Sequence, residues 1–137
     1  MRTLHRIMTI VIVFVATAVL SASFSAAATL TVKTKEGIGS YLVDEKGMAL
    51  YLFKKDAPNK SVCGAENGCL EKWPAFFADA VDPKAGIDPV AVGTITRDDG
   101  LKQTTYKGQP LYRFFKDKDG DDVYGQGTGG VWFVVAP

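Results

Sequence analysis

The feature that most restricts the fold of this 137-residue chain is a repeat of part of its own sequence at an offset of 61 residues. Residues 44–56 read DEKGMALYLFKKD and residues 105–117 read TYKGQPLYRFFKD, with seven of the 13 positions identical. Self-similarity at a fixed offset indicates a duplicated supersecondary unit. We therefore expect two hairpin units, over about residues 40–76 and 101–135, that share one hydrophobic core.

Short strands separated by turn residues are predicted along most of the chain. Apolar and polar residues alternate over residues 30–35, and two apolar runs flank a Gly-containing turn at residues 44–47. Such alternation between turn signals is typical of antiparallel hairpins. The last strand is a continuous apolar run, which predicts burial on both faces. The predicted strands are residues 30–35, 41–43, 50–53, 90–96, 101–106, 110–115 and 131–135.

One helical turn is predicted within residues 69–80, where Trp73 and Phe76 lie at helical spacing and Pro74 interrupts the pattern. Residues 81–89 carry Asp and Pro turn signals and are predicted to form a surface loop. About seven strands and one short helix indicate a mainly β fold. We expect a small antiparallel sandwich or barrel-like domain built from two pseudo-repeated hairpin units plus one short helix.

Each unit carries a tyrosine, a phenylalanine two residues later and an aspartate three residues after that. On a strand, Tyr51 and Phe53 face one side and Leu52 the other, and Arg113 takes the place of Leu52 in the second unit. Because an arginine indicates a partly solvated face, we expect the aromatic face to be core, with a ligand platform as the alternative. The aspartates are expected to cap the turns that follow the strands. The motif residues are Tyr51, Phe53, Asp56, Tyr112, Phe114 and Asp117.

Residues 1–27 have the organisation of a secretory signal peptide. Basic residues precede an apolar run of about 14 residues, and small residues at positions 25–28 follow it. The run is shorter than the ~20 residues of a membrane-spanning helix. We therefore expect cleavage at Ala27 or Ala28, no membrane span after processing, and a single β-rich domain over residues 28–137. The expected location is periplasmic or extracellular.

Removal of residues 1–27 changes the charge and the available chemistry. The whole chain has 16 Lys+Arg, 15 Asp+Glu and one histidine; Arg2, His5 and Arg6 lie in the removed segment. The mature chain is thus near neutral, which argues against nucleic-acid binding. It also lacks histidine, so Ser-His-Asp and Cys-His catalytic sites and His-ligated metal or haem sites cannot be assembled.

Cys63 and Cys69 are expected to form a local disulfide. An even number of cysteines in an exported chain favours pairing, and the glycines and asparagine between them let a short loop close. Closing seven residues stabilises the fold by about 2.4 kcal/mol in the chain-entropy model. A redox-active pair is the alternative, although the spacing differs from the C-x-x-C of oxidoreductases.

The repeated motif also carries a resemblance. Residues 51–56 (YLFKKD) and 112–117 (YRFFKD) both fit Y-x-[FWY]-x-x-D, and C-x5-C leading to KWP and a GQGTGGVW segment accompany them. With these features the chain resembles a family of bacterial predicted lipoproteins, also described as a secreted repeat of unknown function. The resemblance implies an envelope location and no particular activity. No lipid anchor is expected, because the first cysteine, Cys63, lies far from the processing site.

Two loops of the second unit suggest ligand sites. Asp117, Asp119, Asp121 and Asp122 form an acidic loop that could bind Ca²⁺, but the glycine and glutamate of an EF-hand are missing at positions six and twelve. A solvated turn is the favoured interpretation. The glycine-rich residues 125–130 lack the Lys-Ser/Thr of a phosphate-binding loop and are expected to bend the backbone sharply against the sheet.

Two classes of function follow. The first is an exported, non-catalytic binding or structural module of the bacterial cell envelope, without a cofactor and with an unidentified envelope component or small ligand as partner. The alternative is a carboxylate-dependent hydrolase that uses Asp56 and Asp117 as acid and base, which requires the two carboxyl groups to face a common pocket. The absence of histidine and the small size favour the first class.

Overall fold

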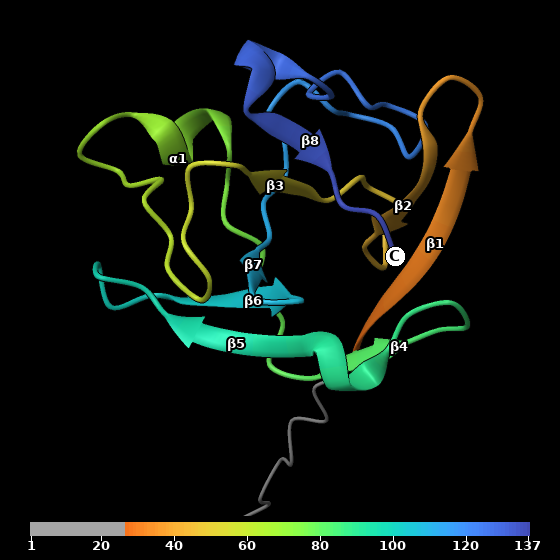
Figure 1. The fold of residues 1–137 in the computed structure, drawn as a ribbon, viewed down its shortest axis with the longest axis horizontal. Coiled ribbons are helices and arrows are strands. Elements are labelled where there is room, and N and C mark those ends of the chain that lie inside the picture. Colours follow the sequence, from red (N-terminus) through yellow and green to blue (C-terminus); the bar gives the residue numbers. More distant parts are fainter. Residues whose placement is uncertain (1–26) are drawn as a thin grey trace, which may run out of the picture.

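The structure is a computed structural model that describes residues 27–137, so the predicted export signal before Ala27 lies outside the described residues. The fold is mainly β with one short helix, as predicted (Figure 1). Among residues 27–137, no helix is long and apolar enough to cross a membrane. The elements are β1 (Ala28–Lys35), β2 (Gly39–Val43), β3 (Tyr51–Phe53), α1 (Cys69–Lys72), β4 (Val81–Pro83), the 3-10 turn η1 (Pro89–Ala91), β5 (Val92–Thr96), β6 (Lys102–Tyr106), β7 (Gln109–Pro110), the 3-10 turn η2 (Thr128–Gly130) and β8 (Trp132–Val134).

The strands form three small sheets, with the orders β2-β1-β4, β3-β8 and β5-β6-β7. The hairpins β1–β2 and β5–β6 are antiparallel, as their alternating sequences predict. The predicted turn after β2 also forms, since the Asp44 N–H donates to the Met48 carbonyl (3.0 Å). The second hairpin starts later than expected, because Pro89 initiates η1 and delays β5 to Val92.

The sequence predicts a loop over residues 81–89, and this is wrong for the first three residues. They form β4, which pairs in parallel with β1, with Ala28 opposite Val81 and Leu30 opposite Pro83. Residues such as Asp and Pro are depleted in strands, so the pattern gave no strand signal. Pro83 is tolerated because β4 is an edge strand, where one N–H is not needed for pairing.

The two units exchange their last segments. We call residues 28–76 the first unit and residues 92–135 the second unit. β3 of the first unit pairs with β8 of the second, and the two strands lie side by side in Figure 1. Residues 72–76 at the end of the first unit pair in turn with residues 111–115 of the second unit. The Phe76 N–H, for example, donates to the Leu111 carbonyl (2.9 Å). The β3–β8 sheet therefore takes one strand from each unit, whereas β5, β6 and β7 all belong to the second unit.

Tyr51 and Tyr112 lie at the centre of this exchange. Each tyrosine N–H donates to the other's carbonyl, at 2.8 Å and 2.9 Å. The flanking bonds repeat on both sides: Lys54 N–H donates to the Val131 carbonyl (2.8 Å), and Phe115 N–H donates to the Lys72 carbonyl (2.9 Å). The units are therefore related by a pseudo-twofold axis that passes between the two tyrosines.

Residues 110–115 are predicted to form a strand, but only the end of β7 and two isolated bridges at Tyr112, to Tyr51 and to Ala75, are found there. The partner segment explains the difference. Arg113 N–H donates to the Pro74 carbonyl (2.8 Å), whereas Pro74 has no N–H with which to return a bond. The corresponding residue of the second unit is Phe133, which stays in a continuous ladder opposite Leu52.

The hydrophobic core has two clusters, one on each side of the motif strands. The aromatic side is buried, as expected, but Leu50 and Leu111 on the opposite side are fully buried as well. The partly solvated face that Arg113 predicts is therefore limited to the surroundings of Arg113 itself, which is half-buried. Arg113 lies at the margin of this face, where its guanidinium pairs with the buried Asp44 carboxylate (Nη2–Oδ2 2.6 Å).

The prediction that residues 131–135 are buried on both faces is also wrong in part. Trp132 and Val135 are buried, whereas Phe133 and Val134 are only half-buried. The edge of β8 away from β3 is bonded to the glycine-rich loop, since Gly127 N–H donates to the Trp132 carbonyl (2.8 Å) and Val134 N–H to the Gln126 side-chain oxygen (2.7 Å). The exposure of Phe133 is therefore on a face of the strand, where the Lys54 Nζ lies 4.3 Å from the centroid of the Phe133 ring.

Candidate functional site

The aromatic residues of the motif pack into one column at the pseudo-twofold axis. Trp73 and Trp132 are stacked at its centre, with ring centroids 3.8 Å apart and planes 3° from parallel. Each indole then carries a phenylalanine from the other unit: Phe53 on Trp132 (4.2 Å) and Phe114 on Trp73 (4.3 Å). The rings thus pack against one another, as the core interpretation expects.

The hydroxyl groups of the two motif tyrosines cross the boundary between the units. Tyr51 donates to Asp117 (2.6 Å), and Tyr112 donates to Asp56 (2.7 Å). Each aspartate also accepts a backbone N–H from its own loop: that of Val62 for Asp56 (2.7 Å), and that of Tyr124 for Asp117 (3.0 Å). Each motif aspartate therefore ties its own loop to the other unit's strand.

Burial raises the pKa of both carboxyl groups above the ordinary value, Asp56 and Asp117 alike. The tyrosines are fully buried, and loss of solvent together with the adjacent carboxylate raises their pKa well above the usual range. The phenols therefore remain protonated donors at neutral pH. Asp56 and Asp117 act in separate loops, and neither lines either of the two pockets described below.

Close approach of the backbone explains one glycine of the glycine-rich loop. A Cβ atom on Gly125 would lie 2.8 Å from ring atoms of both Trp73 and Tyr51. The Gly125 N–H instead donates to the Tyr51 hydroxyl (3.2 Å). The loop therefore bends sharply against the aromatic column, as the sequence predicts.

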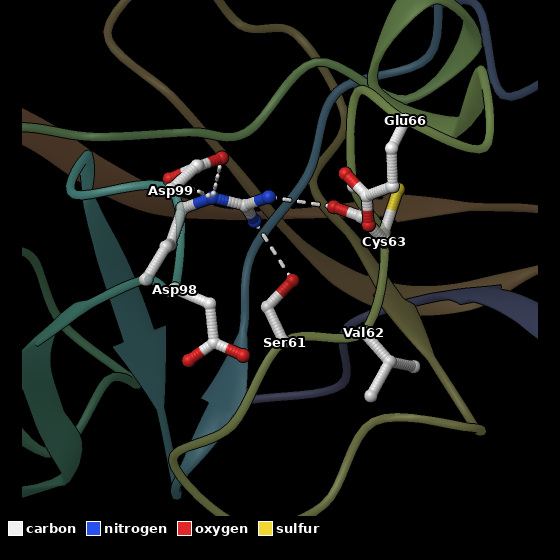
Figure 2. A pocket seen from close by; sticks show the side chains of 8 residues that line it. Ser61, Val62, Cys63, Glu66, Asp98 and Asp99 are labelled. Atoms are coloured by element: carbon white, nitrogen blue, oxygen red, sulfur yellow. Dashed lines mark hydrogen bonds and ion pairs between the residues drawn. The ribbon is translucent and has the colours of Figure 1, made fainter.

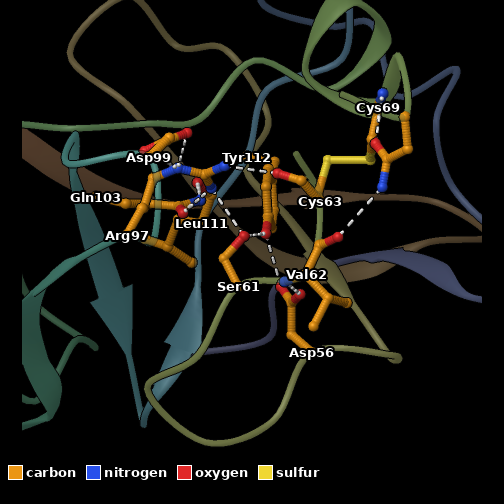
Figure 3. Close-up of a disulfide and its surroundings, with 11 residues drawn as sticks. Asp56, Ser61, Val62, Cys63, Cys69, Arg97, Asp99, Gln103, Leu111 and Tyr112 are labelled. Atoms are coloured by element: carbon orange, nitrogen blue, oxygen red, sulfur yellow. Dashed lines mark hydrogen bonds and ion pairs between the residues drawn. A yellow bond between two sulfur atoms is a disulfide. The ribbon is translucent and has the colours of Figure 1, made fainter. Parts of the chain in front are cut away.

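Cys63 and Cys69 form the predicted disulfide, with their Cα atoms 5.2 Å apart (Figure 3). Cys63 is fully buried against the aromatic cluster. The Asn67 side chain accepts the Cys69 N–H (3.0 Å), which closes the turn into α1. The bond holds the loop of the first unit that corresponds to the glycine-rich loop of the second.

Arg97, which the sequence analysis did not single out, holds the same loop from the second unit. Its buried guanidinium donates to the Cys63 carbonyl (2.6 Å), the Ser61 hydroxyl (2.7 Å) and the Gln103 side-chain oxygen (2.7 Å), as Figure 3 shows. Its Nε donates to Asp99 (3.1 Å). The sequence predicts that an arginine before an Asp-Asp-Gly turn is exposed to solvent. Only the folded structure shows that this arginine binds residues far away in the sequence.

A polar pocket of ≈ 240 Å³ lies over this arginine (Figure 2). The disulfide loop forms one wall and the turn after β5 forms the other. The Arg97 cation is already satisfied by its protein partners, and Asp98 pairs with Lys60 (2.6 Å). The pocket is lined by Ser61, Val62, Cys63, Gly64, Glu66, Arg97, Asp98 and Asp99.

The acidic loop of the second unit does not gather its carboxylates around a common point. Asp117 is buried against Tyr51, and Asp121 pairs with Lys33 of β1 (2.9 Å). Asp122 accepts the N–H groups of Lys118 and Asp119 (2.7 Å and 2.9 Å). Within residues 27–137, no group of three or more His, Cys, Asp or Glu side chains is placed to hold a metal ion.

A second, more open pocket of ≈ 550 Å³ lies on the surface of the second unit. It is lined by two exposed rings, Phe115 and Tyr124, and by Lys116 and Lys118. We call these four residues the aromatic patch. The sequence analysis did not identify it, because single exposed aromatic residues give no pattern.

Comparison with known proteins gives a family and no closer relative. A family model described as a secreted repeat of unknown function matches the chain twice, over residues 31–76 and 93–136. No curated protein and no solved structure matches the chain. The description of the family and the disulfide together indicate an extracytoplasmic protein.

Proposed function

Because the chain belongs to the family of secreted repeats of unknown function, we propose that it is a non-catalytic module of the bacterial cell envelope that binds an envelope component. The location is the periplasm or the cell exterior. The proposal also takes the predicted export signal to be removed before the protein acts.

The use of the motif residues is the observation that carries this proposal. The tyrosines and aspartates of the motif form hydrogen bonds between the two units, so the residues that define the repeat build a scaffold. These residues are Tyr51, Tyr112, Asp56 and Asp117. Among the described residues, no buried side-chain nitrogen or oxygen lacks a hydrogen-bond partner. The hydrogen bonds of the buried polar side chains are thus completed within the protein, as a scaffold requires.

The available functional groups also favour binding over catalysis. Residues 27–137 contain no histidine, and both cysteines are in the disulfide. The two aspartates with raised pKa values lie in separate loops, each accepting two hydrogen bonds. The surface instead offers pockets, and two of them lie on the loops that the scaffold holds.

Cosedimentation of the mature protein with isolated cell-envelope fractions tests this function. We expect the folded protein to be retained by one fraction, and reduced, alkylated, unfolded protein to be lost from it. The soluble phase should contain no released sugar or peptide fragments. Release of such fragments that is abolished by Asp56→Asn or Asp117→Asn would instead establish the hydrolase. Absence of retention by every fraction would overturn the binding role.

A further inference from the structure

We propose that the aromatic patch of the second unit binds an anionic glycan, with the sugar rings on Phe115 and Tyr124 and the acidic groups near Lys116 and Lys118. This inference rests on the proposed binding function and names the place and the class of ligand. Four observations carry it: exposure of the rings, comparison with the first unit, free charge, and the shape of the surface.

The two rings are exposed although the protein has a well-formed core. Tyr124 is 67% and Phe115 41% exposed, and both line the same open pocket. Scattered apolar side chains on a surface need no explanation, but adjacent exposed rings that line one pocket are typical of a contact surface.

The repeat provides an internal control for what the fold requires. The position of Phe115 is taken by Lys54 in the first unit, and both residues make the same backbone bond across the boundary. The loop that corresponds to the one carrying Tyr124 is closed in the first unit by the Cys63–Cys69 disulfide. The scaffold therefore forms without an aromatic residue at these positions, so the patch is not a demand of the fold.

The lysines of the patch are free of acidic partners. Neither Lys116 nor Lys118 forms a salt bridge with a residue that the structure describes, and the Lys116 ammonium lies 5.7 Å from the centroid of the Phe115 ring. Of the carboxylates next to the patch, Asp121 pairs with Lys33, and Asp122 accepts the backbone N–H groups of Lys118 and Asp119 and not a lysine ammonium. The patch therefore combines two exposed rings with two unpaired positive charges.

A glycan suits this surface better than the other anionic polymers. Sugar rings present flat C–H faces that pack on aromatic rings, while their carboxylate or phosphate groups project from the ring edge. A peptide that adds a strand needs an unpaired sheet edge, and residues 111–127 contain no strand. Two lysines are also too few for a membrane surface or a nucleic acid, each of which is recognised by larger clusters of basic residues.

Calorimetric titration of the mature protein with three polymers tests the site: alginate as an acidic glycan, dextran as a neutral one and polyglutamate as an acidic peptide. We expect alginate to bind, and Phe115→Ala or Tyr124→Ala to weaken binding about tenfold each. Lys116→Ala should weaken alginate binding, and the binding that remains should depend less on the salt concentration. Lys55→Ala, the matched position in the first unit, should leave binding unchanged.

Amide chemical shifts locate the contact, and thermal unfolding checks that each exposed variant stays folded. Shifts confined to the aromatic patch support the site, whereas shifts around residues 61–66 overturn it. Dextran or polyglutamate binding as tightly as alginate also overturns it. Retention by an envelope fraction without alginate binding refutes the site and leaves the proposed function standing. Alginate binding that depends on Tyr124, without retention by any fraction, refutes the envelope role alone.

Discussion

The two units share one scaffold but secure their long loops in different ways. The loop of the first unit is closed by a covalent bond and by Arg97, which comes from the second unit. The loop of the second unit is held by lysines of β1, which belongs to the first unit: Lys33 donates to the Gly120 carbonyl and Lys35 to the Asp121 carbonyl (2.6 Å). In each unit the long loop is thus held by residues of the other unit, whereas the side chains that the two loops expose are different.

This difference separates scaffold from binding surface. The stacked rings, the tyrosine–aspartate bonds and the exchanged strands occur in both units, so we assign them to folding. The polar pocket beside the disulfide and the aromatic patch each occur once. A duplicated fold can diversify its loops while its shared interior stays fixed, so the unmatched features are the better candidates for binding.

The largest effect is expected from the centre of the column. Trp73→Ala and Trp132→Ala should each lower the free energy of unfolding by about 3–5 kcal/mol, because each removes a buried ring stacked on two others. Urea unfolding followed by circular dichroism measures the loss. Val90→Ala, at a side chain that is 92% exposed, is the control and should change stability by less than ~0.5 kcal/mol. Clearly unequal losses for the two tryptophans would contradict the pseudo-twofold arrangement.

Removal of the disulfide should affect the first unit alone. The double variant Cys63→Ala/Cys69→Ala should lose about 2.4 kcal/mol, the closure entropy of a seven-residue loop. Hydrogen exchange should rise around residues 61–69, where Arg97 holds the Cys63 carbonyl, and stay unchanged in the loop of the second unit. Equal loosening of both loops would show that they are not secured independently.

The two tyrosine–aspartate bonds should differ in strength. Tyr51→Phe leaves the Asp117 carboxylate without its phenol donor in a buried site, which should cost about 1–3 kcal/mol. Tyr112→Phe should cost less, because Asp56 is only half-buried and water can replace the lost donor. Urea unfolding of both variants at neutral pH decides, and a larger loss for Tyr112→Phe would reverse this ranking.

The dependence of stability on pH should have a specific sign. Burial raises the pKa of Asp56 and Asp117, so the folded state binds protons more tightly than the unfolded state at pH values just above the ordinary carboxyl pKa of about 3.9. Stability from this source is complete below that pKa and is lost as the pH rises through the raised values. The free energy of unfolding should therefore fall as the pH rises from about 4 through the raised pKa values of the two carboxyl groups.

Asp56→Asn and Asp117→Asn should each reduce the pH-dependent decrease in the free energy of unfolding, because each removes the contribution of one carboxyl group. Asp121 is the matched control: the bond from Lys33 lowers its pKa, so its contribution changes below the tested range. A stability that instead rises through this range in the wild-type protein would contradict the raised pKa values.

Local patterns predicted the hairpins, the disulfide and the burial of the aromatic face. The alternation over residues 30–35 and the spacing of Cys63 and Cys69 are local features, because the residues that pair lie close together in the sequence. The exchange of residues 72–76 and of β8 between the units could not be predicted, because a repeat indicates two similar units without indicating which strands pair. Pro74 was the one local signal available: it has no N–H to donate, and this prevents the ladder opposite Arg113.

The candidate binding surfaces were even harder to predict from the sequence. Arg97 reaches Cys63 and Ser61 across 34 and 36 residues of chain, and nothing near it in the sequence indicates those partners. Phe115 is recognisable only by comparison with Lys54, once both are known to occupy the same place in the scaffold. Sequence patterns thus describe the shared interior well and the unmatched surface poorly.

Mutual completion of the two units is the central claim, and fragment complementation tests it most directly. Residues 27–88 and 89–137 would be prepared as separate polypeptides, the first with its disulfide intact. Each alone should lack near-ultraviolet circular dichroism from packed aromatic rings. An equimolar mixture should recover the spectrum of the intact chain and elute as a one-to-one complex. Folding of either fragment by itself, with a packed aromatic spectrum, would contradict the claim.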